Sequence, residues 1–136
     1  MSKVTVVGAG FVGATVAQYL ADREIADVCL VDVVEGMPQG KSLDMMQAAA
    51  ITGHDCEVVG SNDYAATKGS DIVVITAGIA RKPGMSRDEL LKINANIVQG
   101  VAKEAIKYSP DAIFITVSNP LDVMTYLTWK TTKLPA

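Results

Sequence analysis

The sequence is poor in the residues and patterns that mark several large classes of protein. It has two cysteines, Cys29 and Cys56, and they do not stand at the spacing of a metal site. No apolar run approaches the roughly 18 residues that a membrane-spanning helix needs. No stretch is strongly basic, and the net charge is −3. We therefore expect no metal centre, no membrane partner and no nucleic-acid partner.

The remaining composition is that of a globular protein. Of the 136 residues, 49% are hydrophobic and 20% are charged, which allows one domain with a real core. The chain enters an apolar strand after three residues, so we expect no signal peptide and a cytoplasmic location. In that reducing compartment both cysteines are expected to be small buried side chains.

One stretch near the amino terminus organises the rest of the chain. Residues 4–7, which are apolar or β-branched, run directly into a Gly-x-Gly-x-x-Gly pattern, and an apolar helical run follows. In this pattern Gly8 permits a sharp turn, Gly10 lets the backbone approach a pyrophosphate, and Gly13 lets helix and strand pack closely. The free N–H groups at the start of the helix then face the diphosphate of a dinucleotide.

Asp32 supports this interpretation. It closes the apolar run 28–31 and lies 19 residues after Gly13. A carboxylate at the tip of the second strand accepts hydrogen bonds from the ribose hydroxyls and repels a 2′-phosphate, and no arginine follows within residues 33–35 to hold one. The pattern predicts NAD rather than NADP. The plainer alternative is an aspartate that opens a turn before Gly36.

Strands and helices alternate along the whole chain, which predicts an α/β fold with right-handed crossovers. We expect a Rossmann-type doubly wound parallel sheet with strand order 3-2-1-4-5, lacking the sixth strand of the common dinucleotide fold. The predicted strands are residues 4–7, 28–32, 57–60, 71–77 and 112–117. After the glycine turn, the predicted helices are 39–50, a short segment within 62–68, 86–108 and 121–130.

Two helices carry patterns with further implications. In helix 86–108, Ser86 and Glu89 have the form of a capping box. The predicted buried stripe of that helix consists of Leu90, Ile93, Ile97, Val101 and Ala105. In helix 39–50, one face consists of Leu43, Met46 and Ala50.

Several stretches together resemble one family. They are residues 8–13, 31–41, 80–87, 94–97 and 117–122. The chain closely resembles the N-terminal half of NAD-dependent malate dehydrogenases, of the type that is similar to lactate dehydrogenases. The resemblance covers essentially the whole chain and implies a 1–136 NAD-binding domain. It also implies an oxidoreductase of the tricarboxylic acid cycle that converts malate to oxaloacetate, and a homo-oligomer that forms through the helix bearing Leu43, Met46 and Ala50.

The resemblance also implies roles for individual residues. Arg81 holds the second carboxylate of the substrate, and Arg87, the catalytic residue in this chain, polarises the substrate carbonyl. Asn119 contacts both substrate and cofactor. The family often has a cis peptide bond at the position of Asn119-Pro120. The implied cofactor-binding residues are Gly8, Ala9, Gly10, Phe11, Val12, Gly13, Asp32, Asn94, Val117, Ser118 and Asn119.

The family places its catalytic histidine in a second domain, which we do not find in this sequence. The one histidine, His54, follows a helix at the opposite edge of the sheet from the ligand, so we expect a solvated loop residue rather than a base. The chain is therefore expected to be a cofactor half, whether a fragment, an engineered truncation or an incomplete product, and to bind NAD(H) without turnover. Two alternatives stay open: a lactate or other 2-hydroxy-acid dehydrogenase, and a dinucleotide-binding module without chemistry.

Overall fold

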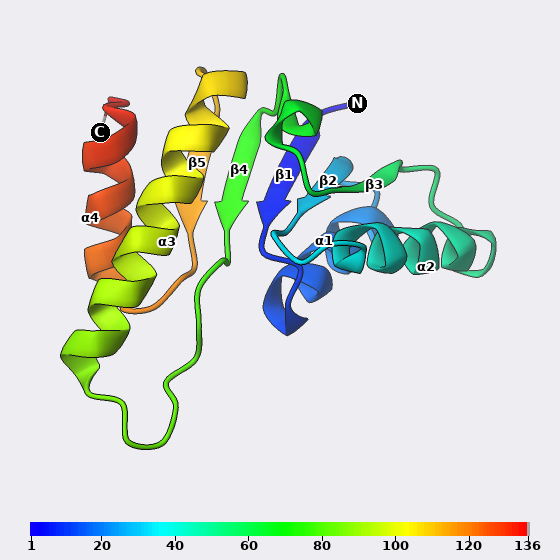
Figure 1. Cartoon of the computed structure of the whole chain (residues 1–136). Coiled ribbons are helices and arrows are strands. Elements are labelled where there is room, and N and C mark those ends of the chain that lie inside the picture. Colours follow the sequence, from blue (N-terminus) through cyan, green and yellow to red (C-terminus); the bar gives the residue numbers. More distant parts are fainter. Residues whose placement is uncertain (136) are drawn as a thin grey trace.

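A parallel sheet lies at the centre of the computed structural model, which describes residues 1–135 (Figure 1). Its strands pair in the order β3-β2-β1-β4-β5, and every neighbouring pair is parallel. This order and direction confirm the predicted topology. The strands are β1 (Lys3–Val7), β2 (Asp27–Val31), β3 (Val58–Ser61), β4 (Ile72–Ile75) and β5 (Ile113–Thr116).

Helices cover both faces of this sheet, as the doubly wound fold requires. Those that follow β1 and β2 pack on one face, and those that follow β4 and β5 pack on the other (Figure 1). The helices are α1 (Phe11–Asp22), α2 (Met37–Thr52), α3 (Arg87–Tyr108) and α4 (Leu121–Thr132), with a short 3₁₀ helix η1 (Tyr64–Thr67) before β4. All of these elements were predicted, with boundaries shifted by a few residues.

The core is divided by the sheet into two apolar layers. Alternate residues of β1 and β4 point to opposite faces, because successive side chains in a strand alternate. Val74 therefore packs with α1 and α2, while Val73 and Ile75 pack with α3 and α4. Both cysteines lie buried and free in this interior, as predicted.

The predicted buried stripe of α3 is partly wrong. Val101 and Ala105 are buried, but Leu90 and Ile97 are only half-buried and Ile93 is exposed. The face of α3 that meets the sheet instead consists of Asn94, Val98, Val101, Ala102 and Ala105. The error arises because the pattern of large apolar residues hid one buried polar residue, Asn94, which lies in line with the core.

α2 packs against the edge strand β3. Its buried residues are Pro38, Ser42 and Met45, and the Sδ of Met46 accepts a hydrogen bond from the Val58 N–H of β3 over 3.1 Å. A side chain at Gly60 of β3 would overlap the carbonyl group of Pro38, so the two elements approach more closely than a β-carbon allows. The side of α2 that carries Leu43, Met46 and Ala50 is exposed in the single chain.

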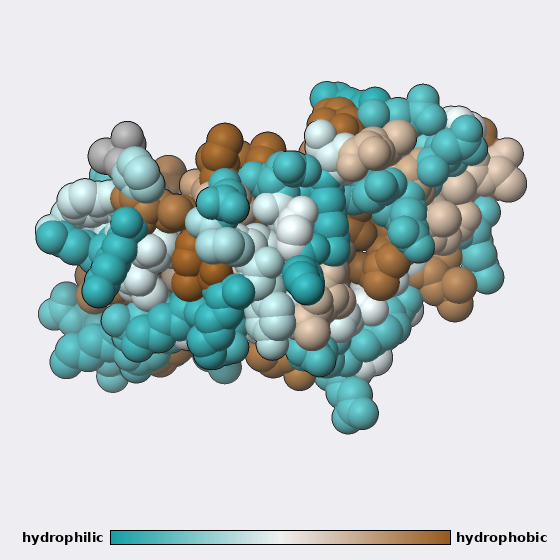
Figure 2. Space-filling model, turned by 90° about the horizontal axis from the view of Figure 1, so that it is seen from above, coloured by the Kyte–Doolittle hydropathy of each residue, from teal (hydrophilic) through white to brown (hydrophobic). Residues whose placement is uncertain are grey.

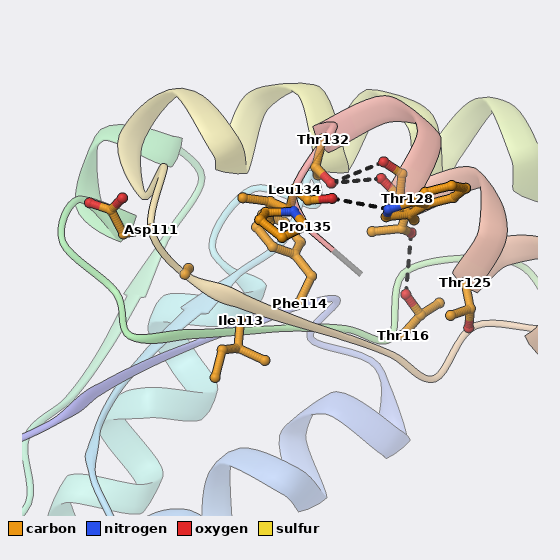
Figure 3. A pocket seen from close by; sticks show the side chains of 11 residues that line it. Asp111, Ile113, Phe114, Thr116, Thr125, Thr128, Thr132, Leu134 and Pro135 are labelled. Atoms are coloured by element: carbon orange, nitrogen blue, oxygen red, sulfur yellow. Dashed lines mark hydrogen bonds between the residues drawn. The ribbon is translucent and has the colours of Figure 1, made fainter.

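The other edge of the sheet is less well covered. On β5, Ile113 is 65% exposed and Ile115 is 46% exposed, because among residues 1–135 no helix covers that side of the strand. A hollow of about 320 Å³ lies between β5 and α4 (Figure 3). Its wall includes the Thr116–Thr128 hydroxyl pair and Trp129, whose indole N–H donates to the Leu134 carbonyl.

The surface at the amino ends of the strands is mixed in character. Seen from that side, hydrophobic side chains form separate patches among hydrophilic ones (Figure 2). Within residues 1–135, no helix has both the length and the apolar character needed to cross a membrane.

Candidate functional site

The predicted site residues gather where the strands end. The glycine turn follows β1, Asp32 follows β2, the loop 76–86 follows β4, and Val117–Asn119 follow β5, so their segments meet at the carboxyl edge of the sheet (Figure 1). β1 and β4 are neighbours although they are not consecutive, so the chain reverses its winding between them. Open α/β sheets bind their ligands at this switch point.

Steric constraints fix the glycine turn. Gly8 has φ +106°, a conformation that L side chains rarely adopt, and a β-carbon there would lie 2.7 Å from the Thr76 hydroxyl. A β-carbon at Gly13 would overlap the carbonyl oxygen of Gly8. The Thr76 hydroxyl donates to the carbonyls of Val7 and Gly8 over 3.1 and 3.2 Å, which ties β4 to the turn.

The start of α1 is open toward the ligand edge. Its N-cap, Gly10, has no side chain to accept a bond from the first-turn N–H groups, and a β-carbon there would meet nothing. Phe11 is 93% exposed and Val12 is 55% exposed. Unpaired N–H groups at a helix start, reinforced by the helix dipole, favour an anion.

Asp32, which follows β2, forms a hydrogen bond with the glycine turn. Its Oδ2 accepts a hydrogen bond from the Ala9 N–H over 2.6 Å, and its Oδ1 accepts one from Val34 N–H over 2.9 Å. Each carboxylate oxygen can accept more than one hydrogen bond, so both keep capacity for hydroxyl donors. The main chain around Asp32 is held by Asn62, whose amide donates to the carbonyls of Asp32 and Val34.

Lys41 of α2, which was not among the predicted site residues, also contacts this turn. The ammonium of Lys41 donates to the Ala9 carbonyl over 2.5 Å and lies 3.5 Å from the Gly10 carbonyl. It also lies 5.8 Å from the centre of the Phe11 ring. Ala9, which is fully buried, is thus held by Asp32 at its N–H and by Lys41 at its carbonyl.

Asn94 connects two segments of the ligand edge. It is 2% exposed, and its Oδ1 accepts from the Ile79 N–H over 2.8 Å. Its Nδ2 donates to the carbonyls of Ile79 and Asn119. Gly78, with φ +152°, lets the chain pass against Asn94, since a β-carbon there would lie 3.1 Å from the amide oxygen. The amide group of Asn94 is therefore engaged by the protein itself.

The turn after β5 is fixed in a similar way. The Ser118 hydroxyl donates to the Ala77 carbonyl over 2.5 Å and to the Ile75 carbonyl over 3.3 Å. Val117 is 39% exposed. The Asn119-Pro120 peptide bond is cis, as the resemblance implied.

Arg81 and Arg87 lie on the long loop between β4 and α3 and at the start of α3 (Figure 1). Both are exposed, and within residues 1–135 the one hydrogen bond of the Arg81 side chain is from its Nε to the Met85 carbonyl over 3.0 Å. The predicted capping box is present: Ser86 and Glu89 each accept a hydrogen bond from the other's backbone N–H. The bond from the Ser86 backbone lowers the pKa of Glu89.

His54 is not the solvated loop residue that was predicted. Gly53 ends α2 in the left-handed conformation, and the chain then turns inward, so the imidazole is fully enclosed. Its Nε2 lies 4.0 Å from Asp22 at the end of α1, and neither ring nitrogen has a hydrogen-bond partner within residues 1–135. His54 precedes β3, at the amino edge of the sheet, as expected, so it is not part of the site.

Two ionisable side chains, the half-buried Tyr64 of η1 and the buried Cys29 of β2, have raised pKa values. Burial, with smaller effects of Glu104 and Asp32, raises the pKa of Tyr64 to about 12. Burial also raises the pKa of the Cys29 thiol, against the opposing effect of Lys3. In residues 1–135, no three side chains of His, Cys, Asp or Glu gather as a metal site would require.

Together these features fit a dinucleotide. The turn leaves no room for side chains at Gly8 and Gly13, α1 starts without a capping side chain, and Asp32 points into the turn with unused acceptor capacity. Sequence reasoning missed Lys41 and Thr76. Thr76 could have been noticed as a polar residue near the carboxyl end of the predicted apolar strand 71–77, whereas nothing in the sequence distinguishes Lys41 from other lysines.

Comparison with known proteins gives matches over almost the whole chain. The family model described as lactate/malate dehydrogenase, NAD binding domain, matches residues 2–136. A protein named malate dehydrogenase from Nostoc punctiforme is 60% identical over 135 residues, which are 99% of this chain and 41% of that protein. The chain thus spans about two-fifths of the length of such relatives.

Solved structures agree with this result. The malate dehydrogenase of Salinibacter ruber is 48% identical with a TM-score of 0.91, and the match covers 98% of this chain and 42% of that one. The lactate dehydrogenase of Cryptosporidium parvum, in complex with lactic acid and nicotinamide adenine dinucleotide, is 43% identical with a TM-score of 0.92. That match also covers 98% of this chain and 42% of the other.

Proposed function

The chain belongs to the lactate/malate dehydrogenase family through its NAD-binding domain, and from this membership we propose that it is the cofactor-binding part of a malate dehydrogenase. The observation that carries the proposal is the glycine turn with Asp32 bonded to Ala9. These residues form a complete dinucleotide turn within the 136 residues. A homo-oligomer and a cytoplasmic location stay predictions.

The proposed reaction of the full-length protein is hydride transfer between C2 of malate and the nicotinamide ring. Bound NAD supplies the ring that accepts the hydride. The guanidinium of Arg81 binds the distal carboxylate, because a planar fork pairs with two carboxylate oxygens and keeps its charge. Arg87 polarises the carbonyl oxygen on which negative charge develops.

His54 cannot act as the base that takes the hydroxyl proton, because its ring is enclosed at the amino edge of the sheet. We therefore propose that the 136-residue chain binds NADH without turnover. Lactate dehydrogenase is the second candidate, favoured by the likeness to the Cryptosporidium parvum enzyme. The cationic Arg81 argues for a dicarboxylate instead, since lactate has a methyl group where malate has a carboxylate.

Titration of NADH fluorescence with the purified chain tests this function. We expect saturable binding of NADH, weaker binding of NADPH because Asp32 repels the 2′-phosphate, and a loss of NADH affinity in Asp32→Ala. The exposed Asp44 provides the matched control, since Asp44→Ala changes the net charge equally outside the site. Absence of NADH binding, or malate-dependent NAD reduction that His54→Ala abolishes, would overturn the proposal.

A further inference from the structure

We propose that Lys41 is a cofactor-positioning residue that supplies the cation for the diphosphate of the dinucleotide. The inference rests on the NAD binding proposed above and concerns a residue outside the glycine pattern. Its starting point is the contact of the Lys41 ammonium with the carbonyl oxygens of Ala9 and Gly10, inside the turn where a diphosphate is expected.

The charges at this turn are unbalanced without Lys41. Asp32 is an anion bonded to the Ala9 N–H, and a dinucleotide diphosphate brings two more negative charges to the same turn. Main-chain N–H groups at the start of α1 provide only partial positive charge. Among the side chains of residues 1–135, Lys41 is the cation that makes hydrogen bonds to the turn.

The ammonium also keeps donor capacity for a phosphate oxygen. A lysine ammonium has three N–H donors. The Ala9 carbonyl takes one over 2.5 Å, and the Gly10 carbonyl, at 3.5 Å, lies at the limit of a hydrogen bond. At least one donor therefore has no close protein acceptor, and the exposed ring of Phe11 beside it forms an apolar wall rather than a competing acceptor.

The helix that carries Lys41 is fixed relative to Asp32. Gln39, two residues before Lys41, donates its side-chain amide to Asn62 over 2.7 Å. Asn62 in turn donates to the carbonyls of Asp32 and Val34. The carbonyl group of Pro38, near the start of α2, also packs closely against Gly60 of β3. The ammonium is thus held beside the turn before any ligand arrives, which reduces the entropy lost on binding.

The test compares NADH affinity at low and high ionic strength for the unsubstituted chain, Lys41→Met and Lys41→Arg. Lys103→Met is the matched control, because Lys103 is exposed on α3 and its loss changes the net charge equally. We expect Lys41→Met to weaken NADH binding about tenfold or more at low salt, as for a lost hydrogen bond to a charged group. Lys41→Arg should stay within about threefold of the unsubstituted chain, and Lys103→Met should leave the affinity unchanged.

The salt dependence of NADH affinity distinguishes a contact of Lys41 with phosphate from a purely structural role of Lys41 in the turn. Salt screens exposed charges, so the affinity of the unsubstituted chain should fall as salt rises while that of Lys41→Met changes little. Equal affinities of Lys41→Met and the unsubstituted chain, or a loss that is the same at both salt concentrations, would overturn the role of Lys41. If Lys41→Met and Lys41→Gln both failed to fold by circular dichroism, Lys41 would be structural and the proposal wrong. Lack of NADH binding by the unsubstituted chain would overturn the proposed function together with this inference.

Discussion

The side-chain amide of Asn94 donates a hydrogen bond to the main-chain carbonyl of Asn119 over 2.8 Å, across 25 positions of the chain. The same amide accepts from and donates to the main chain of Ile79. One buried side chain of α3 therefore sets the spacing between the loop after β4 and the turn after β5. Both segments carry residues expected to meet the substrate.

Replacement of Asn94 by alanine should destabilise the chain and disturb the site together. It removes three part-buried hydrogen bonds and leaves main-chain groups of Ile79 and Asn119 without these partners, so we expect the free energy of unfolding to fall by about 2–4 kcal/mol. Urea denaturation followed by circular dichroism measures the change. Asn96→Ala, on an exposed position of the same helix, is the control and should cost less than about 1 kcal/mol. Equal effects of the two substitutions would show that the bridge contributes little.

Two glycine substitutions should act in opposite directions. Gly13→Ala places a methyl group on the Gly8 carbonyl, so we expect a loss of about 3 kcal/mol or more in the free energy of unfolding and loss of NADH binding. Gly100→Ala, in the middle of α3 with nothing within 4 Å of the added methyl, should raise the free energy of unfolding by about 0.5–1 kcal/mol. Thermal unfolding and NADH titration report both effects. A Gly13→Ala chain that bound NADH normally would refute the close-packing argument.

The capping box at the start of α3 should make stability depend on pH. Its hydrogen bonds lower the pKa of Glu89 in the folded chain below the ordinary value of 4.5. The ionised carboxylate therefore stabilises the fold above that value, and the contribution is lost as the pH falls through the folded pKa. The difference in urea midpoint between the unsubstituted chain and Glu89→Gln should narrow when the pH is lowered from 6 to about 3. A difference that stayed constant over this range would assign the effect to something other than the charge.

Arg81 is predicted to select the substrate. The prediction is tested in a protein in which this segment is joined to a catalytic domain, by comparing kcat/KM for malate and lactate. A charge-assisted hydrogen bond is worth about 1.5–3 kcal/mol, and a guanidinium left without a partner costs a similar amount. Arg81→Gln should therefore lower the malate preference by about a hundredfold or more. Lys82→Gln, which removes a neighbouring exposed charge, should leave the preference within about threefold, and an equally small change in Arg81→Gln would remove the main argument for malate.

The exposed side of α2 is predicted to mediate self-association. Leu43 is 58% exposed and Met46 is 38% exposed, and together with Ala50 they form an apolar surface that a second copy of the chain would cover. Sedimentation at high concentration should detect a dimer or larger species. Leu43→Glu should dissociate this species if it forms through α2. The exposed edge strand β5 is the other surface through which two chains could associate, and Ile113→Glu should dissociate the species only in that case. A chain that sedimented as a monomer at all concentrations would contradict both possibilities.

Much of the fold follows from local patterns in the sequence. The apolar runs around Val6 and Val74 predict buried strands, and their alternation with helices predicts a parallel sheet with right-handed crossovers. The strand order follows from the glycine pattern, which is typical of the doubly wound dinucleotide fold. The sequence pattern also predicts a sharp turn at Gly8 and close packing of helix on strand at Gly13. The positive φ of Gly8 and the steric clash at Gly13 agree with these two predictions.

Other features depend on contacts between distant segments and could not be predicted. Asn94 lies in the buried stripe of α3 because partners on two loops satisfy its amide, so a polar residue occupies a core position. Lys41 is on a helix position that looks solvent-facing, and its role emerges only when α2 is placed beside the turn. His54 was predicted to be solvated because it follows a helix end, whereas the turn at Gly53 directs its side chain inward.

The burial of His54 provides the protein with a spectroscopic label. It is the one histidine of the 136 residues, so its two ring carbon protons give a single, unambiguous pair of NMR signals. The ring is enclosed beside the end of α1, just after the end of α2, which is the helix that carries Lys41 to the glycine turn. Those protons would report any shift of α2 on filling of the turn, so their chemical shifts test, at one edge of the sheet, whether α2 stays fixed at the other.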